Sequence, residues 1–351
     1  MSGRMAGGMA ADQSKQRRRR NGKRWLWFPV AAAIILIVAL LLSQVKYMKY
    51  QSEISRYLEN SSAFCRIPGI EDGFIPQGLS YDPETDRVLL AGYMGSGGAS
   101  PIYIVDRQSG SAVKVLMQTE TGKNFKGHAG GLSLRAGTAY IAGSTANCVY
   151  CFSLDALLGA TEDGALAADA KIELKNRDDY IRVSFTAENT EMLFAGEFHK
   201  APLFYTHASH AVDTPDGRQK AYLFGFTPDE KNCAVPRVVY SIPDNVQGAC
   251  FDGDYLYLSQ TDGLLSARIL CFDLSKLSAA GTKTVLNAEV PLYILGEHAA
   301  VKCTRIPPMS EEILVVDGNL LILYESASNR YRIGKKLGLD HVLATPIEFF
   351  R

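Results

Sequence analysis

The segment QGLSYDPETDRVLLAGY (Gln77–Tyr93) contains an extended run, a tight polar turn, and an apolar run that ends in a polar residue. Apolar side chains recur in it with a period of two, which is typical of a strand whose two faces differ. The DPETD sequence between the runs has the residues that favour a tight turn. The segment therefore predicts a β-hairpin.

The same pattern occurs in four more segments, GGLSLRAGTAYIAGS (130–144), VSFTAENTEMLFAGE (183–197), QGACFDGDYLYLSQ (247–260) and EEILVVDGNLLILYE (311–325). In every copy the residue that ends the second strand lies seven positions after the turn residue, and successive strand ends are 51, 53, 63 and 65 residues apart. Self-similarity at such a period indicates a repeat architecture. The strand ends are Tyr93, Ser144, Glu197, Gln260 and Glu325.

A third strand is predicted after each hairpin, and several repeats have a fourth. The third strands are PIYIVD (101–106), NCVYCFSL (147–154), AYLFGF (221–226), ARILCFDL (267–274) and NRYRIG (329–334), and the fourth strands include AVKVLMQ (112–118), PRVVYSI (236–242) and VPLYILG (290–296). Four antiparallel strands per repeat are the unit of a β-propeller, in which neighbouring blades cover each other's faces. The predicted fold class is therefore all-β, a β-propeller. Five repeats can be counted, and residues 65–75 and 336–350 leave room for a sixth, irregular sheet.

QGLSYD (77–82) and IYIVDRQSG (102–110) together resemble the hairpin and third strand of bacterial propellers in the strictosidine-synthase, senescence-marker and NHL-repeat-like superfamily. The resemblance covers residues 75–350 at the level of repeat shape. It implies six blades and, as in several members, an axial metal that serves lactone or phosphoester hydrolysis. The metal-ligand pattern of those families has no position-by-position match here, so that activity is not carried over.

The N-terminal part has a different composition from the repeats. Residues 1–24 contain eight basic groups and one acid, which predicts a cytoplasmic tail. The next nineteen residues, WLWFPVAAAIILIVALLLS (25–43), carry no charge and are long enough to cross a hydrocarbon core of about 30 Å. They predict an uncleaved single-pass transmembrane signal anchor, because a cleavable signal peptide has a shorter apolar run and a small-residue cleavage site. The C-terminal domain is then expected outside the cytoplasm.

Residues 44–62 predict a helical stalk, and residues 63–351 the extracytoplasmic propeller domain. Tyr47, Tyr50, Ile54 and Tyr57 recur at three- and four-residue steps, the spacing of one helix face. This stripe fits either a dimerising or domain-packing role, or a helix lying against the membrane or the propeller.

Beyond residue 24 the chain has 29 basic and 36 acidic groups, a balance that argues against nucleic acid as a partner.

Propeller geometry converts the repeat into a site prediction. The innermost strand of a blade starts, and the next strand ends, at the same rim of the ring, where loops on a rigid scaffold carry function. We therefore expect polar side chains from distant parts of the chain to converge on one ligand-binding mouth. The strand starts supply Gln77, His128, Arg182, Gln247 and Glu311, and the strand ends supply Tyr93, Glu197, Gln260 and Glu325, with His199 just beyond.

Structural roles for these residues remain open alternatives. Gln77 and Gln247 each precede a glycine and fit a role in satisfying backbone groups at a crowded axis. Arg182 and Glu197 fit an ion pair between neighbouring strands. His128 lies among glycines in GHAGG, which leaves its imidazole accessible for a ligand, a metal or acid–base chemistry. Strand alternation predicts that only one carboxylate of Glu311-Glu312 points toward the axis.

The loop from Phe198 to Lys220 contains two further histidines, His207 and His210, with Asp213 and Asp216 nearby. The H-x-x-H spacing with carboxylates permits metal ligation. The surrounding Thr, Ala, Ser and Pro-Asp-Gly residues are more typical of a solvated insertion, so no metal ligand is assigned here.

Two classes of function fit this pattern. The favoured one is a membrane-anchored domain that binds a small molecule, a glycan or an envelope protein through the polar rim of its channel. The alternative is a metal-assisted hydrolase of lactones, phosphoesters or glycosides, in which Glu197, Glu311, Glu325 and His128 hold a divalent metal such as Ca²⁺ and supply a general base. Glycoside hydrolysis without a metal would need two carboxyls roughly 5–10 Å apart across the mouth. The sequence contains none of the nucleophile, phosphate-loop or zinc-protease motifs that would name an enzyme class.

Overall fold

The computed structural model describes residues 7–334 and 338–351, and the side chains of residues 7–31, 34 and 332–334 lie outside this description. The chain divides into two compact units, with the boundary between Ser55 and Arg56. In its described residues the first unit is helical and belongs to α1 (Gly7–Glu59), whose last turn lies in the second unit. The predicted stalk is thus part of one continuous helix that ends at Glu59.

The predicted anchor, residues 25–43, falls partly on the N-terminal residues whose side chains are not described. A search of the described residues finds no helix with a stretch long and apolar enough to qualify as a membrane span. The basic tail, residues 1–24, lies wholly outside the described side chains.

All five predicted hairpins are present in the second unit, and each provides the two inner strands of one sheet. Apolar side chains from both faces of these strands are buried, because each sheet is covered on two sides. The hairpins are β2 (Phe74–Asp82) with β3 (Arg87–Met94), β6 (Ala129–Arg135) with β7 (Thr138–Gly143), β11 (Val183–Glu188) with β12 (Leu193–Glu197), β17 (Val246–Asp252) with β18 (Tyr255–Thr261), and β23 (Ser310–Val316) with β24 (Asn319–Tyr324).

Each hairpin is extended outward by a third and a fourth antiparallel strand. These are β4 (Pro101–Asp106) and β5 (Ala112–Gln118), β8 (Cys148–Ser153) and β10 (Ala170–Glu173), β15 (Ala221–Pro228) and β16 (Ala234–Ile242), β19 (Ala267–Asp273) and β22 (Lys302–Ile306), and β25 (His341–Pro346) and β1 (Ser62–Arg66).

Two of the predicted outer strands are wrong. NRYRIG (329–334) forms the short 3-10 helix η4 (Asn329–Gly334), and the third strand of the last sheet is β25 instead. VPLYILG (290–296) overlaps β21 (Ala288–Ile294), which pairs in parallel with β16 of the preceding sheet, so the fourth strand of its own repeat is β22. Both segments lie in long connections after the hairpins, where apolar alternation alone does not identify the pairing partner.

Several short elements complete the second unit. They are β9 (Gly164–Ala167), parallel to β5, β20 (Gly281–Val285), paired with β21, the hairpin β13 (Val212–Thr214) and β14 (Gly217–Gln219), and the helices α2 (Leu154–Leu158), η1 (Ala208–His210), η2 (Leu274–Lys276), η3 (Glu297–Ala299) and η5 (Ile347–Phe350).

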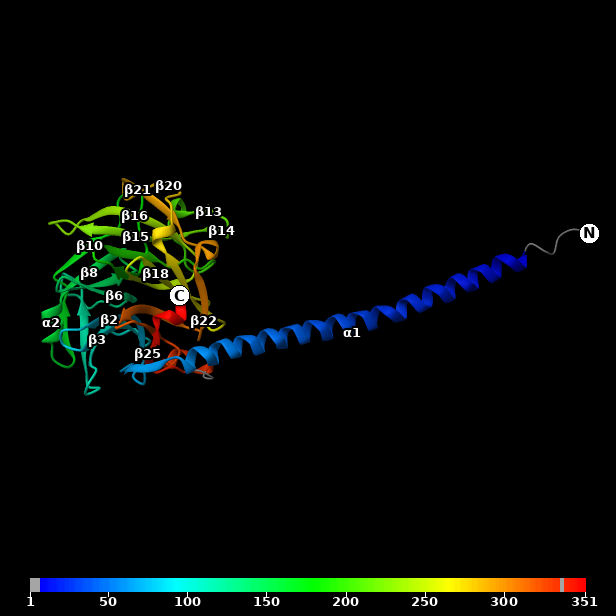
Figure 1. The fold of residues 1–351 in the computed structure, drawn as a ribbon, viewed down its shortest axis with the longest axis horizontal. Coiled ribbons are helices and arrows are strands. Elements are labelled where there is room, and N and C mark those ends of the chain that lie inside the picture. Colours follow the sequence, from blue (N-terminus) through cyan, green and yellow to red (C-terminus); the bar gives the residue numbers. More distant parts are fainter. Residues whose placement is uncertain (1–6, 335–337) are drawn as a thin grey trace, which may run out of the picture. The chain divides into compact units, whose positions relative to one another are not determined.

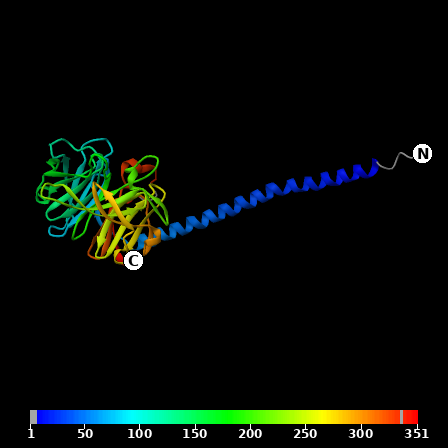
Figure 2. The same cartoon turned by 90° about the horizontal axis from the view of Figure 1, so that it is seen from above.

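The five sheets close into a ring, because their innermost strands contact one another in the order β2, β6, β11, β17, β23 and back to β2. The colours of Figure 1 pass from cyan through green and yellow to red around this succession, and Figure 2 shows it again after a turn of 90°. Five separate hydrophobic clusters fill the spaces between neighbouring sheets, one per space. The described fold is therefore a five-bladed β-propeller.

The six blades implied by the resemblance are not found in the described residues. The segments that left room for a sixth sheet, around β1 and β25, pair with each other as the two outer strands of the fifth blade. The last blade thus combines strands from both ends of the propeller domain, which closes the ring. Tyr57 of α1 packs on this blade with a fully buried side chain, and its hydroxyl accepts a hydrogen bond from Tyr324.

Candidate functional site

The start of every inner strand is irregular, and this irregularity positions the candidate site. In each of the five inner hairpins the pairing register shifts near the first residues of the inner strand, the signature of a β-bulge. The shifts lie between Pro76 and Gly78, Ala129 and Leu132, Val183 and Phe185, Val246 and Gly248, and Ser310 and Ile313. Bulges change the direction of side chains. Three of the five predicted strand-start residues, Gln77, Gln247 and Glu311, lie within these shifts, whereas His128 and Arg182 directly precede β6 and β11.

Two carboxyl groups and two amides meet at one end of the ring. Glu311 and Glu325 share a hydrogen bond. Gln77 donates its Nε2 to Glu325 Oε2 at 3.1 Å, and Gln247 donates its Nε2 to Glu311 Oε1 at 3.4 Å. These four side chains come from three blades, as predicted for the mouth of a propeller.

An aromatic pair adjoins these four side chains. His128 Nδ1 lies 3.4 Å from Gln77 Oε1, and its ring lies on Tyr93 with centroids 4.1 Å apart. Arg330 donates from its guanidinium to the Tyr93 hydroxyl at 2.9 Å. We define the mouth cluster as the six predicted side chains that meet here, which are Gln77, Tyr93, His128, Gln247, Glu311 and Glu325.

The ionisation of the mouth cluster is strongly shifted. Burial raises the pKa of Glu325 to about 7, against the lowering effect of its hydrogen bonds. Burial and the neighbouring Glu325 raise the pKa of Glu311 well above its usual range. Burial and the Arg330 charge lower the pKa of His128. Both carboxyls are therefore harder to ionise than an ordinary glutamate, and the imidazole is harder to protonate, which is an arrangement suited to ligand binding or proton exchange.

The prediction that only one of Glu311 and Glu312 points toward the axis is wrong. Both side chains are almost fully buried, with exposed fractions of 1% and 2%. Glu312 reaches from β23 to β6, where its Oε2 accepts a hydrogen bond from the Leu132 amide at 2.9 Å. The bulge between Ser310 and Ile313 contains both glutamates and breaks the alternation on which the prediction rested.

Arg330 and Tyr331, which both contact the mouth cluster, are missing from the sequence-based prediction. Tyr331 is hydrogen-bonded to Glu325. Both residues belong to η4, which the sequence pattern assigned to a strand. The signal that points to them is the pair of polar and aromatic residues in the segment that directly follows Glu325.

The remaining four predicted residues contact other groups. Arg182 donates to the Tyr205 carbonyl at 3.1 Å and makes no side-chain ion pair with Glu197, because Glu197 accepts the Arg182 backbone amide instead. His199 Nδ1 lies 2.9 Å from Asp244 Oδ2. Gln260 donates to the Asp244 carbonyl and accepts from Arg268.

Glu197 belongs to a second cluster beneath the 198–220 insertion. Its Oε2 lies 2.7 Å from His210 Nδ1, and His210 Nε2 lies 3.1 Å from Asp179 Oδ1. The insertion is largely exposed, as predicted, but His210 within it is fully buried. Burial lowers the pKa of His210, yet the two carboxylates outweigh this effect and raise that pKa to about 9. Asp179 was not identified from the sequence, because it lies in the connection before β11 and is not part of any recognisable motif.

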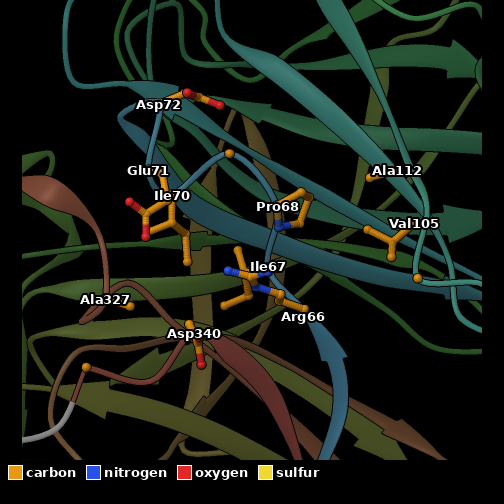
Figure 3. Close-up of a pocket in the computed structure, with 13 residues that line it drawn as sticks. Arg66, Ile67, Pro68, Ile70, Glu71, Asp72, Val105, Ala112, Ala327 and Asp340 are labelled. Atoms are coloured by element: carbon orange, nitrogen blue, oxygen red, sulfur yellow. The ribbon is translucent and has the colours of Figure 1, made fainter.

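A surface pocket of about 530 Å³ lies between the last and first blades. Figure 3 shows its walls, with Arg66 at the end of β1, Asp72 on the segment that joins β1 to β2, and Val105 and Asp340 from the two flanking blades. None of the residues predicted as site residues lines this pocket.

No protein-family model matches the chain, and no curated protein matches it either. The chain is similar in fold to a structure in a nidogen–laminin complex, with 10% identity, coverage of 72% of this chain and 73% of that chain, and a TM-score of 0.41. It is also similar to the Myxococcus xanthus glutaminyl cyclase, with 9% identity, coverage of 75% and 88%, and a TM-score of 0.40.

A third similar structure is a putative oxidoreductase (glucose dehydrogenase) from Thermus thermophilus, with 12% identity, coverage of 81% and 98%, and a TM-score of 0.37. At such low identities and TM-scores, these similarities carry no argument about the site or the function.

Proposed function

We propose that the chain is a membrane-anchored binding domain that holds a small polar ligand at the mouth cluster. The observation that carries this proposal is the hydrogen-bonded pair of carboxyls, Glu311 and Glu325, with the Gln247 amide bonded to the first and the Gln77 amide to the second. Buried carboxyls with strongly perturbed ionisation and convergent polar groups are typical of functional sites.

The chemistry of the mouth cluster favours a ligand with an amine and several hydroxyl groups, such as an amino sugar of a glycan. A ligand ammonium group can replace the proton between the two carboxyls, because opposite charge stabilises the ionised pair. The amides of Gln77 and Gln247 can bond hydroxyl groups. The rings of Tyr93 and His128 offer an apolar face beside them.

Hydrolysis receives less support from the same geometry. A retaining glycosidase, which forms a covalent intermediate, needs its two carboxyls about 5 Å apart. The hydrogen bond between Glu311 and Glu325 holds these carboxyls closer together than that. Glu197, one of the four residues considered as metal ligands with a catalytic role, bonds to His210 rather than to the mouth cluster.

The binding proposal is tested by thermal unfolding of the full chain in detergent, with glucosamine, glucose or spermidine added. A ligand at a hundredfold excess over its Kd stabilises the native state by about 2.7 kcal/mol. We expect glucosamine to raise the midpoint more than glucose does, and Glu325→Gln to abolish that difference. Glu348→Gln, a change at an exposed carboxylate, is the matched control and keeps it. Equal shifts in wild type and Glu325→Gln, or no shift with any of the three compounds, would overturn the proposal.

The membrane part of the proposal rests on residues 25–43. Ile35, Leu36 and Leu41 of α1 expose 69%, 61% and 60% of their surface within the described helix. Large apolar side chains in such a row are stable in lipid rather than in water. The basic tail, residues 1–24, then lies on the cytoplasmic side and the propeller on the other.

A further inference from the structure

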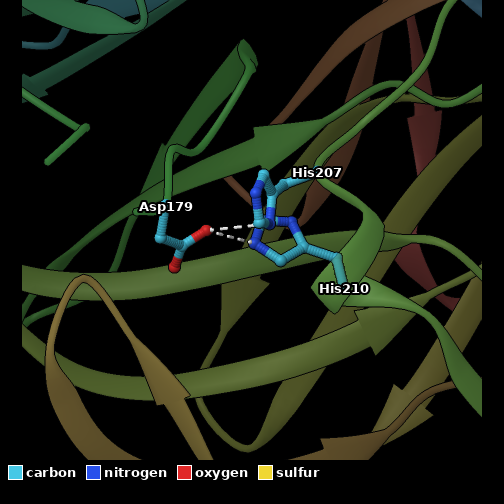
Figure 4. Close-up of side chains that lie close together, drawn as sticks. All are labelled: Asp179, His207 and His210. Carbon is cyan, nitrogen blue, oxygen red and sulfur yellow. Dashed lines mark hydrogen bonds and ion pairs between the residues drawn. The ribbon is translucent and has the colours of Figure 1, made fainter. Parts of the chain in front are cut away.

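Asp179, His207 and His210 bring three metal-binding side chains together away from the mouth cluster. Figure 4 shows both imidazoles facing the Asp179 carboxylate. Asp179 lies in the connection that leads to β11, whereas the histidines lie at and within η1 of the 198–220 insertion. One donor atom from each of the three lies within 4.8 Å of the other two.

The two distances from Asp179 match those of a small coordination sphere. Asp179 Oδ1 lies 3.1 Å from His210 Nε2 and 3.4 Å from His207 Nδ1. Two ligands at about 2.0–2.1 Å from a tetrahedral zinc ion are about 3.3 Å apart, so both pairs are spaced like edges of such a tetrahedron. A metal at His207 Nδ1 would replace its present 2.7 Å hydrogen bond with the Ser209 hydroxyl.

Two of the three side chains are held in orientation by partners behind them. Glu197, which is fully buried, bonds His210 Nδ1 and thereby leaves Nε2 directed at Asp179. Asp179 Oδ2 accepts the Leu286 amide at 3.0 Å, which leaves Oδ1 directed at the histidines. A carboxylate behind a ligating histidine is the usual outer partner in zinc sites, since it fixes the tautomer and the ring orientation.

A buried hydroxyl without a partner also points to a missing group. Tyr222 is fully buried, its ring stacks on His210 at 4.3 Å, and no described residue bonds its hydroxyl. Burial and the charges of Glu197 and Asp179 raise the pKa of this hydroxyl. An unsatisfied buried hydroxyl is costly, and water on a metal ion beside it would supply the missing hydrogen bond.

We propose that Asp179, His207 and His210 form a zinc-binding site in which Glu197 orients His210. Two imidazole nitrogens with one carboxylate oxygen suit Zn²⁺, whereas Ca²⁺ and Mg²⁺ prefer oxygen ligands alone. Three protein ligands leave a fourth position for water. Because the ligands come from two segments, zinc fastens the insertion to the connection before β11.

The test is calorimetric titration of Zn²⁺ into the full chain in detergent, after removal of metal with a chelator. We expect one zinc ion per chain and no binding of Ca²⁺ under the same conditions. Glu197→Gln should weaken zinc binding about 10- to 100-fold, the range found for outer partners of zinc ligands. His207→Ala removes a half-exposed ligand and should weaken binding at least as strongly. Zinc should also raise the unfolding midpoint of wild type but not of His207→Ala.

His298→Ala is the matched control, because His298 also pairs with an aspartate, Asp216, at 2.7 Å but belongs to no three-ligand group among the described residues. This variant should bind zinc like wild type. Absence of zinc binding to wild type would overturn the proposal, and so would equal affinity in wild type and His207→Ala. Loss of binding in His298→Ala alone would place the zinc elsewhere and overturn it too. His207 lies at a partly exposed position, so its variant is expected to fold, and circular dichroism checks this.

Discussion

At the scale of single residues, the mouth cluster is costly to keep in the folded state. Glu325 has a pKa of about 7 in the folded protein, compared with 4.5 for an ordinary glutamate, and burial is the main cause. Between these two values the folded chain holds a proton that the unfolded chain has released. The contribution of this group to stability is therefore present below about pH 4.5 and is lost as the pH rises through 7.

This difference in pKa between the folded and the unfolded chain predicts that stability depends on pH. Glu325→Gln keeps the shape of the side chain and removes the ionisation, so the variant should gain stability relative to wild type as the pH rises. One pKa unit corresponds to about 1.4 kcal/mol, which makes the gain about 1–3 kcal/mol at pH 8 and close to zero at pH 4.5. Denaturant unfolding at both pH values measures it. Glu84→Gln, at an exposed turn, should show no such trend, and a parallel trend in both variants would contradict the assigned cause.

The mouth residues also show what the sequence can predict at this scale. The rule that inner-strand starts and second-strand ends share one rim correctly grouped Gln77 with Glu325, and Gln247 with Glu311. It could not place Glu312, because a bulge depends on contacts between blades and leaves no simple periodic signal. Nor could it show that Glu197 bonds His210 instead, since that contact depends on how the insertion folds.

At the scale of elements, the inner strands approach one another more closely than side chains allow. A Cβ atom added to Gly130 in β6 would lie 1.9 Å from the Ser184 carbonyl oxygen of β11. One added to Gly248 in β17 would lie 2.7 Å from the Cα of Glu312 in β23. Backbone packs directly on backbone at these positions, so neighbouring inner strands are in direct contact there. A structural role, close approach of the backbone at the axis, was left open above for the two Gln-Gly pairs. These contacts support that role for the glycines.

We expect Gly130→Ala to destabilise the protein by about 3 kcal/mol or more, because neither backbone can move without disturbing the ring. Gly98→Ala is the matched control, since its nearest contact would be 3.8 Å away, and its effect should stay within about 0.5 kcal/mol. Chemical denaturation of both variants tests this. Equal stability of the two variants would show that the strands are not closely packed at the axis.

The elements differ in how far the sequence could predict them. The five hairpins follow from short-range alternation and turn residues, so all ten of their strands were predicted. The outer strands depend on long-range pairing. The parallel pairing of β21 with β16 joins residues from two repeats, and no pattern within one repeat indicates it.

At the scale of the whole molecule, ring closure and charge segregation are separate properties. The pairing of β1 with β25 joins the two ends of the propeller domain and closes the ring. The charge pattern also divides the chain, with the basic excess confined to residues 1–24 and an acidic excess beyond. A closed, acidic propeller preceded by a basic and then an apolar segment is the organisation expected of an anchored ectodomain.

This organisation leads to a test of the anchor in cells. An arginine near the middle of a membrane-spanning helix opposes insertion by about 2.5–3.5 kcal/mol, so Ile35→Arg combined with Leu36→Arg should release the chain from the membrane. The matched control is Leu264→Arg with Leu265→Arg, two changes at exposed leucines of the propeller, with exposed fractions of 60% and 75%. It should stay in the membrane fraction after alkaline extraction, as wild type should.

Protease added to intact cells or sealed vesicles then reports the orientation of the wild-type chain, because only the domain outside the cytoplasm is accessible to it. We expect digestion of residues 63–351 in cells and protection of residues 1–24 by the membrane. Release of wild type by alkaline extraction would contradict an integral anchor. Retention of the Ile35→Arg, Leu36→Arg variant would show that attachment depends on the propeller, and binding at the mouth cluster would then be the first cause to examine.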